Sequence, residues 1–166
     1  MLKQLFIPLA AVAIFITLVG IYTQKPNMLN FDKNSSTTNI QQKTVTVGSK
    51  SVQVEIANNE SLRKKGLGGR SSLPQDSGML FVFDTKNTTP TFWMKDMLIP
   101  LDFIWISGTK IVKIDRNIAI PSANTPDAKL DKIRPNQPVG YVLEVNSGFA
   151  DSNNIKVGDS VDLSKI

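Results

Sequence analysis

Residues 44–56, TVTVGSKSVQVEI, indicate the class of fold, because apolar and polar side chains alternate on both sides of one turn. Apolar residues occupy every second position, which is the spacing at which side chains of a β-strand share one face. Gly48, Ser49 and Lys50 separate the two runs and are typical of a turn. The stretch therefore predicts two antiparallel strands, and we expect the folded domain to begin near Lys43.

The remainder of the chain continues in short apolar runs between turn signals. Helices are predicted over 60–65, capped by Asn58 or Asn59 and ended by Gly66 in the left-handed conformation, and over 147–154. Further strands are predicted over residues 79–83, 91–95, 103–106, 110–116, 139–145 and 157–163. Roughly eight strands with two short helices favour a mainly β fold, either a sandwich or a small closed barrel.

The stretch from Asn117 to Gln137 departs from this pattern. It contains Pro121, Pro126 and Pro135 and has no regular apolar spacing. Proline removes a backbone donor and fixes one backbone torsion, so a stretch with three prolines does not continue a strand or a helix. We predict that this stretch is a long exposed excursion.

The N-terminal segment from Leu5 to Tyr22 has 18 residues and no charge. A helix of that length is close to the thickness of a hydrocarbon core, about 30 Å. No Ala-x-Ala-like cleavage site follows it, so an uncleaved signal anchor is favoured over a cleaved signal peptide or a buried core helix. Lys3 precedes the segment and favours an orientation that places the rest of the chain outside the cytoplasm.

This reading divides the chain into three parts. Residues 1–23 form the anchor, residues 24–42 a flexible polar tether and residues 43–166 a β-rich extracytoplasmic domain. The expected location is the cytoplasmic membrane, crossed once by residues 5–22, with the domain outside the cytoplasm.

Composition excludes several chemistries. The chain has no histidine and no cysteine, which removes Ser-His-Asp triads, thiol sites, disulfides and the usual zinc, haem and iron–sulfur ligands. No spacing of acidic residues predicts a metal site, and no motif predicts a cofactor. From Lys43 onward the chain has 16 basic and 13 acidic residues, so its net charge is small. Without a broad basic stripe and interleaved aromatic residues, nucleic acid is not an expected partner.

Ordered motifs in the domain resemble a known family. The motifs are Gly66-Leu67-Gly68-Gly69-Arg70, Leu73-Pro74, Gly78-Met79-Leu80-Phe81, Phe92-Trp93-Met94-Lys95, Ile99-Pro100-Leu101-Asp102, Val142-Leu143-Glu144-Val145, Gly148 and Val157-Gly158-Asp159. Together they resemble the domain of unknown function 192 family over about Val52 to Val161. The resemblance implies a mainly β, jelly-roll-like fold and implies no activity, cofactor or catalytic residue.

Charged residues inside apolar motifs are the first candidates for a site. Arg70, Lys95 and Asp102 are of this kind, and a buried charge is tolerated only when it is paired. Asp102 is expected to pair with Arg70 or with Lys95, either as a structural clamp or as part of a ligand-binding cluster. On the structural alternative, Asp102→Ala affects folding more than binding.

Carboxylate and aromatic residues supply two further hypotheses. Asp102 and Glu144 could form a glycosidase pair if they approach within roughly 5–10 Å, but Glu144 could also simply face solvent or a neighbouring Lys. Phe92 and Trp93 are adjacent and cannot both face the core from one straight strand, so one is expected to be exposed. An exposed aromatic ring is a possible sugar platform, and the alternative is that Trp93 and Trp105 only pack on the core.

These observations lead to one preferred function and two alternatives. The preferred function is a non-catalytic binding or structural module at the outer face of the cytoplasmic membrane. Its expected ligands are an envelope polymer, a carbohydrate or a protein partner, bound near Arg70, Trp93, Lys95, Asp102 and Glu144. The alternatives are a carboxylate-dependent hydrolase acting on envelope glycans and an accessory subunit that pairs a β edge with another envelope protein.

Overall fold

The computed structural model describes residues 42–84 and 88–166. The predicted anchor and residues 24–41 of the predicted tether lie outside the described residues. Within the described ranges, no helix is both long enough and apolar enough to span a membrane.

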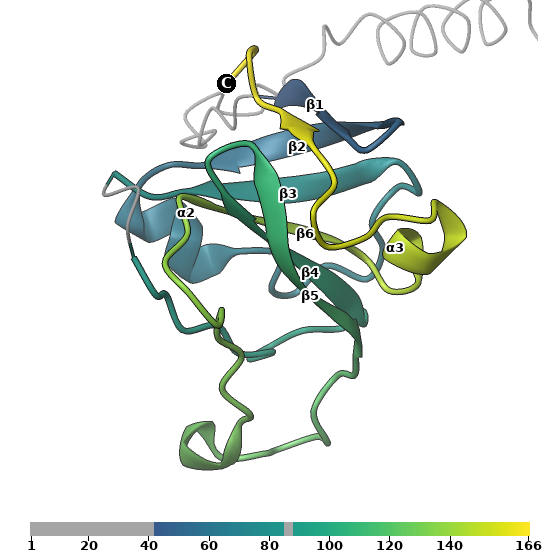
Figure 1. Cartoon of the computed structure of the whole chain (residues 1–166). Coiled ribbons are helices and arrows are strands. Elements are labelled where there is room, and N and C mark those ends of the chain that lie inside the picture. The colour runs from purple at the N-terminus through teal and green to yellow at the C-terminus, as the bar shows by residue number, and fades with distance from the viewer. Residues whose placement is uncertain (1–41, 85–87) are drawn as a thin grey trace, which may run out of the picture. The chain divides into compact units, whose positions relative to one another are not determined.

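The domain is built on one curled sheet of seven strands (Figure 1). The strands are β1 (Gln42–Val47), β2 (Lys50–Ala57), β3 (Ser77–Val82), β4 (Leu101–Ser107), β5 (Lys110–Ile118), β6 (Tyr141–Asn146) and β7 (Val161–Asp162). Their order across the sheet is β5-β4-β6-β3-β2-β1-β7. Neighbours are antiparallel except β2 and β3, which are parallel and are connected through helix α2 (Glu60–Lys65).

The two edges of the sheet approach each other at one end. Lys110 in β5 forms an isolated bridge with Ser160, just before β7. Ile111 donates its N–H to the carbonyl of Asp159 (3.0 Å) and accepts from the N–H of Gly158 (2.8 Å). The sheet therefore curls into a half-barrel whose edge strands meet through these contacts. It is one sheet rather than the two facing sheets of a sandwich.

Each face of the sheet carries its own hydrophobic core. The inner core fills the half-barrel with aliphatic residues, including Ile104, Leu143 and Val145. The outer core covers the opposite face with larger side chains, including Phe103, Trp105 and the methionines of the covering loops. The central strands β3, β4 and β6 are consequently buried on both faces, which explains why their sequences are nearly continuous apolar runs.

The predicted hairpin and first helix are confirmed. β1 and β2 pair antiparallel, with Val45 opposite Val52. Helix α2 begins after Asn59, whose side chain accepts the N–H of Leu62 (2.9 Å). Gly66 ends the helix at φ 51° and ψ −142°, which is a positive φ but is not the predicted left-handed helical conformation. Only glycine adopts that region without strain.

The strand predicted over residues 91–95 is wrong. This segment makes one isolated bridge, between Phe92 and Ile133, and no continuous ladder. Pro90 and Pro135 flank the two bridged segments and lack the N–H groups that a longer ladder requires. The loss of this strand leaves seven strands where roughly eight were predicted.

The C-terminal part of the sequence forms shorter elements than predicted. The second helix, α3, covers only Phe149–Ser152, and the last strand covers only Val161–Asp162. The predicted excursion is present between β5 and β6 and contains a single 3-10 turn, η1 (Asp127–Lys129). Figure 1 shows it extending away from the sheet as the green loop at the bottom of the view.

Candidate functional site

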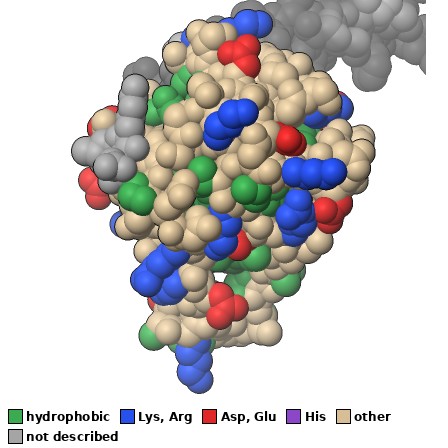
Figure 2. Space-filling view, in the orientation of Figure 1, with side chains coloured by type: hydrophobic (Ala, Val, Ile, Leu, Met, Phe, Trp, Pro, Cys, Tyr) green, Lys and Arg blue, Asp and Glu red, His purple; other side chains and the backbone are tan. Residues whose placement is uncertain are grey.

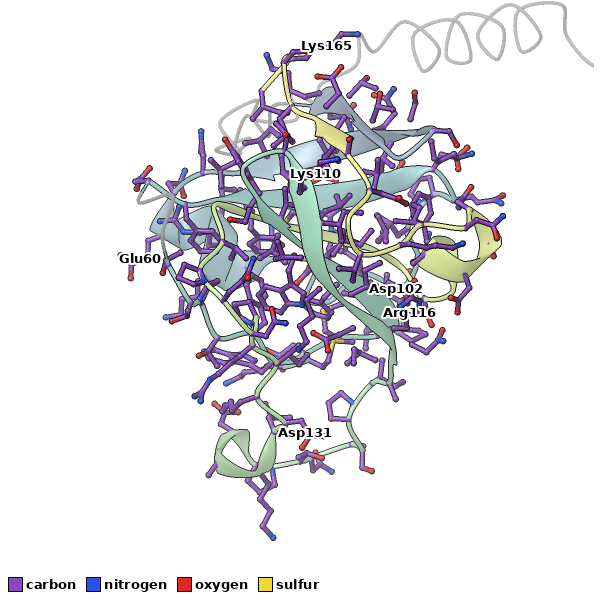
Figure 3. The ribbon with its side chains drawn as sticks, viewed as in Figure 1. Glu60, Asp102, Lys110, Arg116, Asp131 and Lys165 are labelled. Atoms are coloured by element: carbon purple, nitrogen blue, oxygen red, sulfur yellow. The ribbon has the colours of Figure 1, made fainter. Side chains whose placement is uncertain are left out.

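Asp102 is a fully buried structural residue at the corner where β4, β5 and α3 meet. Its Oδ1 accepts the N–H groups of Asn117 (2.8 Å) and Gly148 (3.2 Å), and its Oδ2 accepts the N–H of Ala150 (2.9 Å). Figure 3 shows Asp102 beside Arg116 at this corner. A carboxylate that accepts three backbone donors ties the three segments together and offsets its own burial.

Asp102 forms neither of the predicted ion pairs. Arg70 makes a bidentate contact with Glu55, with 2.7 Å between Nη2 and Oε2. Lys95 bonds to Asp127 at the protein surface. The three charges predicted to cluster therefore lie in three separate contacts, because the donors that satisfy Asp102 are backbone N–H groups.

Glu144 is the second buried carboxyl, with 5% of the residue exposed. On the neighbouring strands its direct partners are Met79 and Phe103, both members of the outer core. Among the described residues we find no hydrogen bond to its carboxyl group. Burial alone raises the pKa of Glu144 to about 8, so the group is mostly protonated at pH 7.

Asp102 and Glu144 lie on opposite faces of the sheet. Directly paired residues share a face, and Asp102 pairs with Val145 of the inner core whereas Glu144 pairs with Phe103 of the outer core. A glycosidase needs two carboxyl groups that face one substrate. Asp102 and Glu144 therefore do not form the predicted catalytic pair. The alternative prediction, that Glu144 faces solvent, is also wrong, because the residue is buried.

Phe92 and Trp93 divide between the core and the surface, as expected for adjacent residues in an extended segment. The ring of Phe92 packs edge-on against Phe81, Phe103 and Trp105, with centroid distances of 4.9–5.6 Å. Trp93 is 47% exposed. The predicted exposure of one ring is thus confirmed, while its role in binding stays a prediction.

Trp105 belongs to the core. It is completely buried, and its indole N–H donates to Oδ2 of Asp115 (2.7 Å). Because its polar N–H is satisfied inside the protein, Trp105 offers no surface to a ligand. The alternative in which a tryptophan only packs on the core holds for Trp105, whereas for Trp93 it stays open.

Trp93 lies at a surface that several contacts hold in place. Lys132 stands over its ring, with Nζ 4.5 Å from the centroid. The Phe92–Ile133 bridge provides two backbone hydrogen bonds of 2.9 Å directly beside this pair. Arg134 donates from Nε to the hydroxyl of Thr91 (2.9 Å). The ring is therefore presented on a fixed segment and not on a loose loop.

The excursion borders a hollow, which we call the arch hollow; Met94 and Ile133 line it, whereas their chain neighbours Trp93 and Lys132 do not. Its volume is about 450 Å³. It is lined by Met94, Asn117, Ile118, Ala119, Ile120, Pro121, Ser122, Thr125, Lys129, Leu130, Asp131 and Ile133. The Lys95–Asp127 ion pair connects the far part of the excursion to the segment that carries Trp93. Figure 2 shows a small opening between the excursion and the body of the domain.

Sequence reasoning did not identify Lys132, Asp127 or Glu55 as partners of the candidate residues. Each of these contacts joins residues at least 15 positions apart. Only Glu55 had a sequence signal, because the alternation of Val54 and Ile56 places it on the face opposite those two residues. Within residues 42–84 and 88–166, no group of three or more acidic side chains is arranged to hold a metal ion.

Comparisons with known proteins agree on the fold. The family model DUF192, described as "Uncharacterized ACR", matches residues 42–163. A Sinorhizobium meliloti protein that has been proposed to be a transcription regulator has a similar structure, with 30% identity and a TM-score of 0.65 over 74% of this chain and 94% of that one. A Novosphingobium aromaticivorans protein of unknown function is 28% identical, with a TM-score of 0.67 over 76% and 89%. No curated protein matches the sequence.

Proposed function

The chain belongs to the DUF192 family of uncharacterized proteins, so a function has to be inferred from the chain's own surface. We propose that it is a non-catalytic binding module held at the outer face of the cytoplasmic membrane. The half-exposed ring of Trp93 is the observation that carries the proposal. An exposed tryptophan on a fixed segment offers a large apolar contact area at little cost in conformational entropy.

The surroundings of Trp93 suit an uncharged polar ligand such as a sugar ring of an envelope polymer. The lining of the arch hollow combines apolar side chains, among them Met94, Leu130 and Ile133, with polar and charged ones: Asn117, Ser122, Thr125, Lys129 and Asp131. Lys95, the chain neighbour but one of Trp93, is bonded to Asp127, and Lys132 lies over the ring itself. Sites of this composition use apolar contact for affinity and a few polar groups for orientation.

Two other classes of function, a hydrolase and a nucleic-acid-binding protein, have less support. Asp102 and Glu144 face opposite sides of the sheet, so the hydrolase lacks its pair of carboxyl groups. The relative proposed to be a transcription regulator is a reason to consider nucleic acid, but Figure 2 shows Lys and Arg interspersed with Asp and Glu on the face in view. A nucleic-acid interface normally requires a broad basic surface.

Binding is tested with the full chain in detergent micelles on an array of envelope glycans. We expect Trp93→Ala to reduce retention at least tenfold and Trp93→Phe to retain most of it, because the ring provides the contact. Val157→Ala is the matched control, since Val157 is also an exposed apolar residue, 60% exposed, and lies outside the site. Equal retention by wild type and Trp93→Ala, or no retention of any glycan, would refute the proposed sugar contact.

Location is tested separately by labelling a single cysteine. The sequence contains no cysteine, so Lys165→Cys introduces a unique thiol at an exposed position near the C-terminus (Figure 3). We expect a membrane-impermeant maleimide to label it in intact spheroplasts. Labelling only after lysis would place the domain inside the cytoplasm and contradict the proposed orientation.

A further inference from the structure

Glu144 lies at the centre of a row of side chains that crosses the outer face of the sheet. The registers of five neighbouring strands place Glu55, Met79, Glu144, Phe103 and Asp115 side by side. The outer members of this row have partners, since Glu55 binds Arg70 and Asp115 accepts from Trp105. Within the row, the direct neighbours of Glu144 are the thioether of Met79 and the phenyl ring of Phe103.

Two loops cover this part of the outer face, and we call them the roof. The first loop consists of residues 66–76. Asn146 in β6 donates from Nδ2 to two carbonyl groups of this loop, those of Leu73 (3.0 Å) and Pro74 (3.1 Å). Asn146 follows Glu144 by two positions and therefore shares its face. The second is residues 94–100, joined to the first by a hydrogen bond from the N–H of Gly69 to the carbonyl of Asp96 (2.8 Å).

The roof adds apolar side chains to the outer core that contains the two strand neighbours of Glu144. Leu67 from the first loop and Met94 and Met97 from the second are buried in the outer core together with Met79 and Phe103. Only 5% of Glu144 is exposed under this cover. The roof contains neither a strand nor a helix, so it is the cover that can open without breaking the sheet.

Among the described residues, no cation is found to counter the effect of burial on the pKa of Glu144. Arg70 of the first loop is held by Glu55, and Lys95 of the second by Asp127. The other charged groups on the two loops, on α2 and on the outer face of β5 are Glu60, Arg63, Lys64, Lys65, Asp76, Asp96, Lys113 and Asp115. None of them contributes to the raised pKa of Glu144, for which burial is the only cause.

We propose that Glu144 is a proton-operated latch, whose protonated carboxyl keeps the two-loop roof closed and whose ionised carboxylate opens it. A neutral carboxyl is tolerated among apolar groups, whereas an unpaired carboxylate there is strongly unfavourable. Opening the roof gives the carboxylate water without unfolding the strands. The inference does not depend on the proposed sugar contact.

The latch makes roof opening depend on pH in one direction. The ionised form is favoured in the open state, where Glu144 titrates near the ordinary value of 4.5, and it is disfavoured in the closed state, where the pKa is about 8. The open population therefore grows as the pH rises from 4.5 to about 8 and is constant above that. Between pH 6 and pH 9 we expect the opening equilibrium to rise on the order of tenfold to a hundredfold.

The latch is tested by hydrogen exchange of the full chain in detergent at pH 6, 7.5 and 9. The exchange rates are corrected for the intrinsic pH dependence of exchange. Peptides covering 66–76 and 94–100 should lose protection with rising pH in the wild type, while β3 keeps it. Glu144→Gln and Glu144→Met cannot ionise and should keep the roof protected at every pH. Glu60→Gln, at an exposed glutamate (Figure 3), should behave as the wild type.

Three outcomes would overturn the latch. The first is equal roof protection in the wild type at pH 6 and pH 9. The second is a pH-dependent loss of protection that persists in Glu144→Gln or, should that variant not fold, in Glu144→Met. The third is loss of protection in β3 together with the roof, which would show global unfolding and not local opening. Sugar binding is not measured, so failure here leaves the proposed function untouched.

Discussion

Two carboxyl groups are buried in the adjacent strands β4 and β6, and they differ in whether hydrogen-bond donors surround them. Asp102 faces the inner side of the sheet and accepts three backbone N–H groups from two other segments. Glu144 faces the outer side, has Met79 and Phe103 as neighbours, and has its pKa raised to about 8 by burial.

The difference shows that burial of a carboxyl group has two physical solutions. Hydrogen-bond donors can compensate the charge, and then the residue organises the backbone that supplies them. Alternatively the group takes up a proton and is tolerated as a neutral side chain, and then its environment responds to pH. The inner corner is therefore expected to be rigid, and the outer roof is expected to respond to pH.

The largest expected effect comes from removing the inner carboxylate. Asp102→Ala leaves one buried and two partly buried N–H groups without an acceptor, and we expect a loss of about 3–5 kcal/mol in the free energy of unfolding. Urea denaturation at pH 7 measures it. Asp151→Ala is the control, because it removes only the exposed Arg116–Asp151 ion pair at the same corner. Similar stability of the two variants would mean that Asp102 does not hold this corner together.

The outer carboxyl is expected to give the next largest effect, with the opposite sign. In the wild type at pH 7 the unfolded chain ionises Glu144 and the folded chain keeps it protonated, which costs up to about 3 kcal/mol for a pKa change from 4.5 to about 8. Glu144→Gln removes this cost and should be more stable than the wild type at pH 7.

The pH dependence separates this explanation from a simple packing effect. Wild-type stability should fall as the pH rises from 4.5 to about 8, whereas Glu144→Gln should lack that part of the slope. Denaturation curves at pH 5, 6.5 and 8 measure the difference. A constant offset between wild type and variant at all three values would contradict a buried protonated carboxyl.

The smallest effect is expected at Glu55, which shares the outer row but has a cationic partner. The hydrogen bond from Arg70 holds the pKa of Glu55 below its usual range, so its contribution is present above pH 4.5 and is lost as the pH falls through the lowered pKa. Because the pair is partly exposed, Glu55→Gln should cost about 1 kcal/mol at pH 7.

The Glu55 variant also sharpens the contrast with Glu144. Stability measured between pH 3 and pH 6 should fall less steeply on acidification in Glu55→Gln than in the wild type. If stability depends on pH between 3 and 6 in the same way in Glu55→Gln and in the wild type, then Arg70 does not lower the pKa of Glu55.

Local patterns were sufficient for much of the fold. The alternation in 44–56 predicted the β1–β2 hairpin, and Asn59 with Gly66 marked both ends of α2. The segment 91–95 has a strand-like composition but forms only one bridge, because its partner segment is interrupted by proline. Local composition records the preference of one segment and carries no information about the segment that must pair with it.

The candidate site was predictable only in part, for the same reason. That one of Phe92 and Trp93 is exposed follows from the alternation of side chains along an extended segment. Which of the two is exposed depends on Phe81, Phe103 and Trp105, which enclose Phe92 from distant parts of the chain. The partners of Arg70 and Lys95 were likewise mispredicted, because they come from residues 15 and 32 positions away.

The sequence by itself determined that the domain is mainly β, where its first strands and helix lie, and which chemistries the lack of histidine and cysteine removes. Those properties depend on residue type and short-range spacing. Only the tertiary structure decided that Asp102 meets backbone donors while Glu144 meets Met79 and Phe103. The electrostatic state of a carboxyl group depends on the groups within a few ångströms of it, and the fold brings those groups together from separate parts of the chain.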